Sequence, residues 1–322
     1  MLDGFSSPEE NLKRASELGL KAIAITEHGE VTSWPYYSEL KDKYPDVKLL
    51  YGIEAYECED REVKDKNSKY WHLIIIAKNE AGRQTVNRLS TLGHLHGFYS
   101  RPRITKEDIA KEDTNNLIIL SACLASRLSK TDDYDTCVKL VQEYKSLFPH
   151  YYLEVQAHAN SEQAKYNQKI MRLANDTHTK VVVTNDVHAA TKEALYYQDY
   201  FLRIAHDTET AAEIYEGCYF MSRREQHEVL DGQIGYDAAE WCINNTDEIA
   251  DLCDYVDMPW HEPELPKIEI PPQYSNSAAY LKDLVKEGWK KRGIDKFDVE
   301  KQKIYRKRVD DELFVIEKKD FC

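Results

Sequence analysis

The sequence has little of what marks a secreted, membrane-bound or DNA-gripping chain. No apolar run approaches the roughly 18 residues of a membrane-spanning helix, and the polar N-terminus is not a secretory signal. The seven cysteines include no C-x-x-C pair, which argues against a disulfide scaffold and favours a reducing cytoplasm. Lys and Arg number 43 against 57 Asp and Glu, and the net charge of −14 disfavours DNA binding by this chain alone.

Glycine and proline are also scarce, at 12 and 10 of 322 residues, and no low-complexity run occurs. Short β-branched runs alternate with amphipathic stretches, which indicates an α/β fold whose mostly parallel sheet is open or closed into a barrel. The expected strands are Lys21–Thr26, Val47–Tyr56, His72–Ala77, Asn116–Ser121, Tyr151–Gln156 and Lys180–Thr184. The expected helices are Ser7–Leu18, Trp34–Tyr44, Glu80–Leu95, Asp135–Leu147, Ser161–Asn175, Lys192–Ala205 and Tyr236–Cys253.

A Pro-rich stretch near residue 258 predicts a domain boundary. We expect one domain over residues 1–257, a connector over 258–276 and the incomplete start of another region over 277–322. That last part holds two charged amphipathic helices, Ala278–Arg292 and Val299–Lys319. Two such helices are too few to bury a core of their own.

Polar side chains stand at one end of each expected strand. They are His28, Glu54, His72, Cys123, His158, Asp186 and His188. Chemistry in parallel α/β folds collects at the carboxyl ends of the strands, so these residues are expected to converge. Such ligands suit zinc, manganese or iron, and two or three such ions would activate water against a phosphoester.

Taken singly, each of these residues has an ordinary structural explanation. A histidine after a strand is more often a loop or capping residue than a ligand, and Cys123 is a typical small buried residue. Only their coincidence at successive strand ends favours a metal site, and from spacing alone both interpretations stay open.

The same segments resemble the PHP (polymerase and histidinol phosphatase) superfamily. Thr26-Glu27-His28-Gly29 is similar to its T-D-H-G motif, with Glu27 in place of the usual aspartate. Gly52–Tyr56 is similar to its G-x-E-x-Y segment and Thr184–His188 to its T-N-D-V-H segment. More narrowly, the chain resembles the family of bacterial DNA polymerase III alpha subunits, which are C-family replicative polymerases. That resemblance rests on Leu2-Asp3-Gly4, Ala77–Gly82, His94–Tyr99, Ser121–Ala125, Asn245–Ala250 and the stretch Tyr280–Ile316.

The resemblance implies a distorted, TIM-like βα barrel that holds up to three divalent metal ions. Carried over residue by residue, the ligands would be Asp3, His28, Glu54, His72, Cys123, Asp186 and His188, with Glu27, His158 and Asn185 behind them. Where the site is intact, the family hydrolyses phosphoesters, including 3′–5′ exonuclease proofreading. In many members the site is degenerate and the domain mainly stabilises the polymerase.

The resemblance also implies that the chain is cut at both ends. The family begins with an H-x-H strand upstream of Leu2-Asp3-Gly4, so the first barrel strand and two ligands would be missing. Cys322 precedes the palm aspartates that use magnesium for nucleotide transfer. We therefore expect part of a replicative polymerase in the cytoplasm. Its partners would be the remaining polymerase sequence or chains and, through them, primer-template DNA, with no membrane.

Two other functions stay open at this point. One is a free-standing metal-dependent PHP phosphoesterase, and the other is a non-catalytic scaffold of the polymerase. The stretch Tyr280–Ile316 favours the polymerase over the free-standing enzyme. Metal content would separate both from the scaffold.

Overall fold

The computed structural model describes residues 4–66, 68–206, 216–258 and 268–322. Its contacts divide the chain into two compact units, Met1–Met258 and Pro259–Cys322, and each is described by itself. Among the described residues, no helix has both the length and the apolar character needed to cross a membrane.

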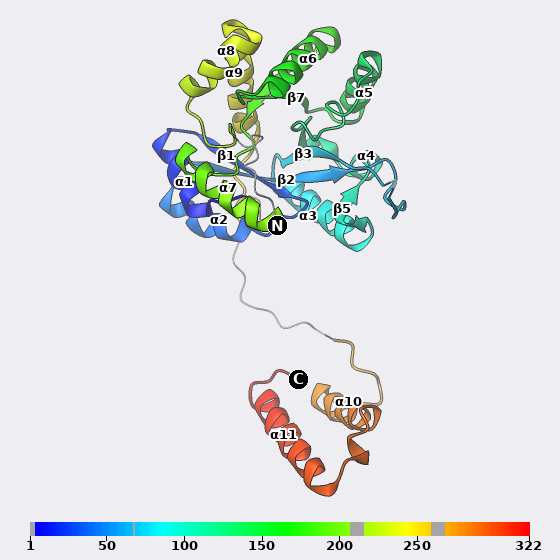
Figure 1. Cartoon of the computed structure of the whole chain (residues 1–322). Helices are drawn as coiled ribbons and strands as arrows, with labels where there is room; N and C mark the ends of the chain where they lie inside the picture. The colour runs from blue at the N-terminus through cyan, green and yellow to red at the C-terminus, as the bar shows by residue number, and fades with distance from the viewer. Residues whose placement is uncertain (1–3, 67, 207–215, 259–267) are drawn as a thin grey trace. The chain divides into compact units, whose positions relative to one another are not determined.

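Strands and helices alternate along the first unit (Figure 1). The strands are β1 (Ala22–His28), β2 (Lys48–Glu57), β3 (Trp71–Ala77), β4 (Phe98–Tyr99), β5 (Arg101–Ile104), β6 (Leu117–Leu120), β7 (Tyr151–Gln156) and β8 (Val181–Thr184). The helices are α1 (Pro8–Glu17), α2 (Trp34–Leu40), α3 (Glu80–Leu95), α4 (Lys106–Ala110), α5 (Tyr134–Leu147), α6 (Ser161–Thr177), α7 (Lys192–His206), α8 (Arg223–Ile234) and α9 (Tyr236–Leu252).

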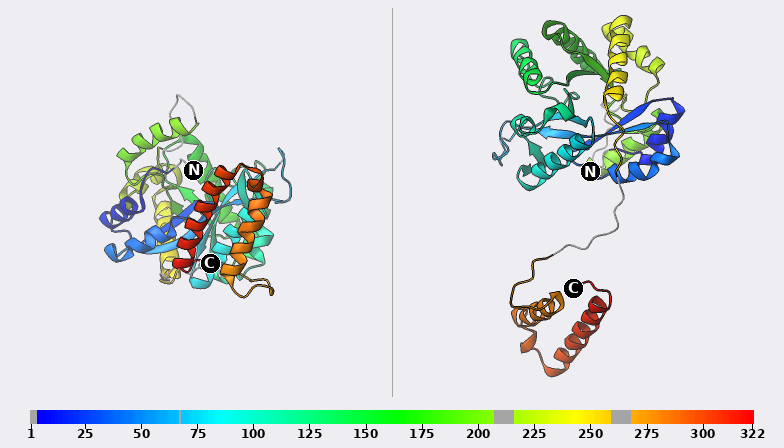
Figure 2. Two further views of the ribbon diagram at one scale, coloured as in Figure 1. Left: turned by 90° about the horizontal axis from the view of Figure 1, so that it is seen from below. Right: turned by 180° about the vertical axis from the view of Figure 1, so that it is seen from behind.

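The strands form one curled sheet, and helices surround it (Figures 1 and 2). Neighbouring strands follow the order β1-β2-β3-β6-β7-β8. The β4–β5 hairpin is attached through β5 to the C-terminal end of β2. Within the described ranges β1 pairs only with β2 and β8 only with β7, so these two strands are the ends of the curl. The predicted α/β class with an incomplete, barrel-like sheet is confirmed.

Strand β3 is an exception in a sheet that the sequence predicts to be mostly parallel. It runs antiparallel to both of its neighbours, β2 and β6, whereas β1–β2, β6–β7 and β7–β8 are parallel. No helix lies in the described part of the connection from β2 to β3, and an antiparallel neighbour needs no crossover helix. The start of β3 therefore lies at the same edge of the sheet as the carboxyl ends of its neighbours.

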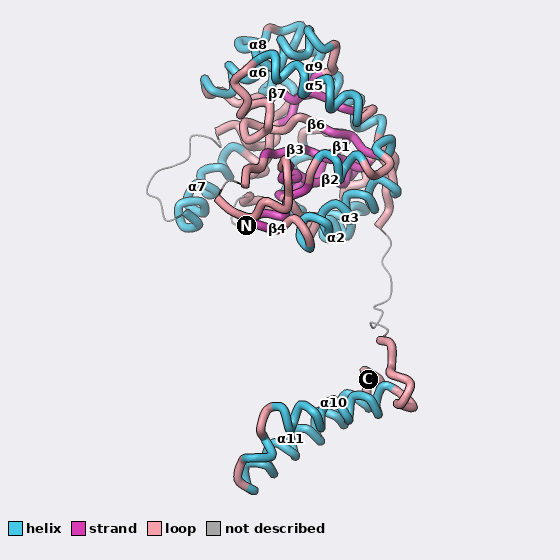
Figure 3. The backbone as a smooth tube through the Cα atoms, turned by 90° about the vertical axis from the view of Figure 1, so that its right-hand side faces the viewer, coloured by secondary structure: helices cyan, strands magenta, loops and turns pink. Residues whose placement is uncertain are grey.

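Alternate residues of each strand face the inside of the curl, because side chains in a strand point to opposite faces in turn. The part of this inner face around Leu50 and Ile76 is apolar, and it is covered by Ile249 of α9 and by Cys253, which directly follows α9. This inner cluster contains Leu50, Ile76, Ile118, Leu120, Tyr152, Val182, Ile249 and Cys253. The other face packs against the surrounding helices, which Figure 3 shows outside the strands.

Helix starts follow the capping chemistry of the sequence. Ser7 caps α1 in a capping box with Glu10, and Asn79 and Asn160 cap α3 and α6 through their side-chain oxygens. All six expected strands are present, each within two residues of its predicted ends.

The elements that the sequence did not predict are short or polar. The strands β4 and β5 have two and four residues and include Pro102, which weakens any strand pattern. Helix α8 buries only Leu230, so its apolar periodicity is faint.

The second unit contains α10 (Ser277–Lys291) and α11 (Val299–Lys318). Neither helix has a buried residue. Large apolar side chains are exposed on both, namely Leu284, Val299, Ile304, Phe314 and Val315.

Candidate metal centre

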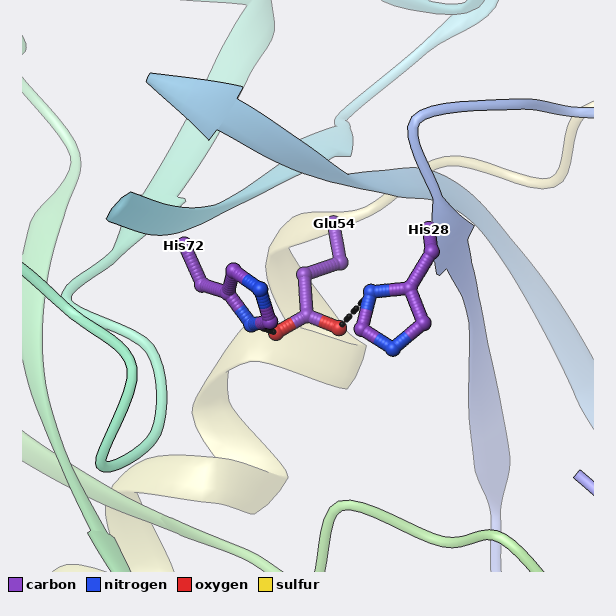
Figure 4. A group of neighbouring side chains, drawn as sticks. All are labelled: His28, Glu54 and His72. Carbon is purple, nitrogen blue, oxygen red and sulfur yellow. Dashed lines mark ion pairs between the residues drawn. The ribbon is translucent and has the colours of Figure 1, made fainter. Parts of the chain in front are cut away.

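Three side chains from adjacent strands meet at the polar end of the inner face (Figure 4). His28 ends β1, Glu54 lies opposite it on β2, and His72 is near the start of β3. The Nδ1 atom of His28 lies 2.9 Å from Oε2 of Glu54, and Nδ1 of His72 lies 2.7 Å from Oε1. One atom of each residue lies within 4.8 Å of the others, as a metal site requires. His72 reaches this group because β3 is antiparallel.

The carboxylate of Glu54 is buried between the two imidazoles. Burial alone would raise its pKa, but hydrogen bonds from His28 and His72 outweigh burial and hold the pKa well below its ordinary value. Glu54 is therefore ionised at neutral pH. An ionised, buried carboxylate beside two histidines is a strong attraction for a cation.

Cys123 borders the same group. Its Sγ lies 3.5 Å from Nδ1 of His72 and 3.7 Å from Oε1 of Glu54. The preceding residue, Ala122, has a φ of 63°, an uncommon backbone conformation for a residue with a Cβ. Burial raises the pKa of the Cys123 thiol well above its ordinary value, and the charges of Asp186 and Glu54 raise it further. A bound cation would reverse that effect, because a metal-coordinated thiol loses its proton.

A second group follows β8. Asp186, His188 and Cys218 each offer a ligand atom, and these atoms lie within 4.8 Å of one another. Nδ1 of His188 lies 2.7 Å from the backbone oxygen of Asp186. A carbonyl oxygen only accepts hydrogen bonds, so Nδ1 carries the proton and Nε2 presents its lone pair. Burial raises the pKa of Asp186, and the charge of the nearby His188 offsets part of this increase.

The remaining predicted residues lie in different places. Asp3 is outside the described residues. His158 and Asn185 are buried together, with Nε2 of His158 3.0 Å from the backbone oxygen of Asn185. Glu27 instead accepts a 2.9 Å hydrogen bond from the N–H of Ser33, and it lines a surface cavity of about 660 Å³ beside α1 and α2.

Sequence reasoning missed two residues near these groups. Cys218 lies far along the chain in a short segment before α8, and no local pattern marks it. Glu154 lies on the inner face of β7 and is 2% exposed. Its Oε1 accepts hydrogen bonds from Gln156 and Thr184, whereas Oε2 has no hydrogen-bond partner among the described protein atoms. The alternation of β7 was the signal that could have identified Glu154.

The two groups fit a divalent metal by their chemistry. Imidazole nitrogen, carboxylate oxygen and thiol sulfur are the ligands of zinc and of similar transition metals. In His28, Glu54 and His72 these donors converge from three strands onto one point. The arrangement is therefore able to hold a divalent cation at the open end of the curled sheet.

Comparison with known proteins agrees with the resemblance in the sequence. Residues 1–158 match the family model of the PHP domain. It is also similar along its length to DNA polymerase III alpha subunits. That of Treponema pallidum is 30% identical and aligns with 100% of this chain, and that of Aquifex aeolicus is 29% identical over 100%. The subunit of Borreliella burgdorferi is 28% identical over 91%.

The chain spans about a quarter of the length of these relatives, between 26% and 29%. Among solved structures, a candidate metal-dependent phosphoesterase from Bifidobacterium adolescentis matches 58% of this chain and 84% of its own, with 15% identity and a TM-score of 0.37. An amidohydrolase from Chromobacterium violaceum matches the same shares, with 11% identity and a TM-score of 0.40.

Proposed function

We propose that this chain is the PHP-containing part of a DNA polymerase III alpha-like replicative polymerase and that its metal centre hydrolyses phosphoesters. The observation that carries the proposal is the extent of the similarity. The relatives from Treponema pallidum and Aquifex aeolicus align with 100% of the chain, whereas the PHP model covers residues 1–158. The second unit therefore shares the similarity, and a free-standing phosphoesterase would have no use for it.

We propose zinc, manganese or iron as the bound ion. Bound there, such an ion would polarise a phosphoester oxygen and lower the pKa of a water molecule. The ligands that we propose are Asp3, His28, Glu54, His72, Cys123, Asp186 and His188. Support comes from the convergence of His28, Glu54 and His72 and from the proton on Nδ1 of His188, which leaves Nε2 to coordinate.

The residues of the chain would contribute position and charge. Glu54 is held ionised by its two histidine neighbours, so it is ready to bind a cation without first losing a proton. Contact with primer-template DNA would be made mainly by the rest of the polymerase, because this chain has a net charge of −14. None of its seven cysteines forms a disulfide, which suits the cytoplasm of a bacterial cell.

The test measures metal and hydrolysis on the same purified protein. Elemental analysis of the wild type, His28→Ala and Asp186→Ala should show metal that each substitution reduces. Release of the 3′-terminal nucleotide from a single-stranded oligonucleotide measures the hydrolysis, and His188→Ala should abolish it, because loss of a ligand impairs coordination of the ion. His96→Ala is the matched control, since His96 is exposed on the C-terminal side of α3.

The outcomes separate the alternatives. Metal that neither substitution affects would refute the ligand assignment. Metal without hydrolysis would leave a scaffold with a degenerate site. To test the link to the polymerase, the nucleotide sequence around the coding region should encode a palm region with its aspartates.

A further inference from the structure

Cys218 is buried beside the ligands that follow β8. Its side chain is 2% exposed, and its sulfur, an oxygen of Asp186 and a ring nitrogen of His188 lie within 4.8 Å of one another. Ligand atoms around a tetrahedral zinc ion are about 3.3–3.8 Å apart. Small side-chain movements would therefore bring all three atoms to bonding distance of one ion.

The backbone ties Cys218 to the same ligands. The N–H groups of His188 and Ala189 both donate to the carbonyl oxygen of Cys218, at 2.8 Å and 3.2 Å. Ala189 and Tyr219 also form a parallel β-bridge. The segment that carries Cys218 is thus hydrogen-bonded to the segment that carries His188, which places the two side chains next to each other.

On its other side, the segment that carries Cys218 packs closely against His158. A Cβ on Gly217 would lie 2.4 Å from Cδ2 of His158, so only glycine lets the segment lie against this imidazole. The Nε2 atom of His158 is 3.0 Å from the backbone oxygen of Asn185 and 3.8 Å from Sγ of Cys218. Because a carbonyl oxygen only accepts, Nε2 carries a proton, and the sulfur faces an N–H donor.

We propose that Cys218 is a thiolate ligand of a second metal position, shared with Asp186 and His188. The inference rests on the metal centre proposed above and adds a ligand to it. The first position, at His28, Glu54 and His72, has Cys123 as its sulfur neighbour. Binding at the second position exchanges the thiol proton for the metal ion and releases that proton to solvent. A sulfur ligand there selects zinc, cobalt or iron(II) over magnesium or manganese.

Cobalt(II) tests this directly, because thiolate bonding produces a charge-transfer absorption that nitrogen and oxygen ligands do not. The full chain is stripped with a chelator, titrated with cobalt without oxygen, and assayed for cobalt per chain. Cys218→Ser should remove roughly half of the absorption and lower the affinity for one of the cobalt ions about tenfold or more. Cys123→Ser should keep a sulfur band that comes from Cys218, and the double variant should have none. Gly217→Ala should reduce the Cys218 band, because the added Cβ pushes the segment away from His158.

Cys242→Ala is the matched control, since Cys242 is buried in α9 with its sulfur against Met171. It should leave both the absorption and the cobalt content unchanged. A full sulfur band in Cys218→Ser, or its complete loss in Cys123→Ser alone, would overturn the inference, as would a wild type that binds no cobalt. Because Cys123→Ser leaves Cys218 intact, the test survives a misfolded Cys218→Ser.

Hydrolysis is scored separately. A sulfur band from Cys218 without phosphoester turnover would refute the proposed activity and support this ligand. Phosphoester turnover together with a sulfur band that Cys218→Ser leaves unchanged would support the proposed activity and refute Cys218 as a ligand.

Discussion

The hydroxyl of Thr246 on α9 accepts a 2.9 Å hydrogen bond from the backbone N–H of Val183 on β8. It also lies 3.1 Å from the carbonyl oxygen of Val183, and the neighbouring Asn245 donates to the carbonyl oxygen of Val181 at 2.8 Å. These groups belong to the outer edge of β8, which no strand covers within the described ranges. Side chains of a helix thus replace a strand partner at this end of the sheet, and an edge closed in this way is a poor template for further pairing.

Thr246→Val should destabilise the protein by about 1–3 kcal/mol, because it leaves the buried N–H of Val183 without a partner while keeping the side-chain shape. Chemical unfolding measures the free energy. Thr91→Val is the control, because Thr91 also bonds a backbone carbonyl of its own helix but is exposed. Equal losses in both variants would show that closure of the β8 edge contributes nothing.

Glu154 gives the protein a pH dependence of unusual sign for a carboxyl group. Burial, with the charges of Asp186 and Glu54, raises its pKa to about 7 despite hydrogen bonds from Thr184 and Gln156. Between its unfolded pKa near 4.3 and this value the folded state binds more protons, so stability falls as pH rises, by about 1.4 kcal/mol per pH unit. Glu154→Gln should therefore be more stable than the wild type at pH 8, by on the order of 3 kcal/mol, and similar to it at pH 4.

Urea unfolding at the two pH values, in the presence of a chelator, measures this difference. The chelator matters because a bound cation would offset the negative charge of Glu154. Glu162→Gln, an exposed substitution in the first turn of α6, should show no such gain. A Glu154→Gln variant that is less stable than the wild type at pH 8 would contradict the argument.

The contribution of His227 to stability should depend on pH in the opposite sense from that of an ordinary buried histidine. Its Nδ1 lies 2.8 Å from Asp231 and its Nε2 2.9 Å from Glu240, and Arg223 also pairs with Glu240. The hydrogen bond with Asp231 raises the pKa of His227 most, and Glu240 adds to it, although partial burial opposes both. The stabilisation is present below the unfolded pKa of about 6.5 and is lost as pH rises through the folded pKa.

His227→Gln should consequently lower the melting temperature at pH 5.5 and leave it nearly unchanged at pH 9. An ion pair this close to solvent is worth at most about 1 kcal/mol, so the shift will be small. His178→Gln serves as the comparison, because His178 is exposed at the end of α6. A larger loss at pH 9 than at pH 5.5 would reverse the assigned sign.

The sequence predicted the strands because β-branched runs are locally distinct, and it predicted His28, Glu54 and His72 because they stand at strand ends. The convergence of His72 depended on the antiparallel direction of β3, which no pattern within β3 specifies. Cys218 could not be predicted, since its place beside His188 arises from backbone hydrogen bonds between distant segments. The alternation of β7 places Glu154 on one face with Tyr152 and Gln156, but only the curl of the sheet shows that this face is the inner one.

At the other end of the sheet, the outer edge of β1 should accept an added strand. Lys21 and Gly29, at either end of β1, hydrogen-bond to β2, and this alternation turns the backbone groups of even-numbered residues outward. Ala24 faces the inside of the curl with Thr26 and His28, yet it is exposed. The backbone N–H of Phe5, near the N-terminus, donates to the carbonyl oxygen of His188, beyond β8, rather than to this edge. Among the described residues β2 is the only strand that pairs with β1, so the outer edge of β1 is a template for pairing.

A peptide with the H-x-H strand of the PHP superfamily should therefore raise the melting temperature, because a ligand that binds only the folded state stabilises it by mass action. It should also raise the metal content, since its two imidazoles would arrive beside His28. Thermal unfolding and elemental analysis are compared with an A-x-A peptide of the same length. No shift with either peptide would exclude strand addition at β1. An equal shift with both, without added metal, would show pairing in which the two histidines take no part.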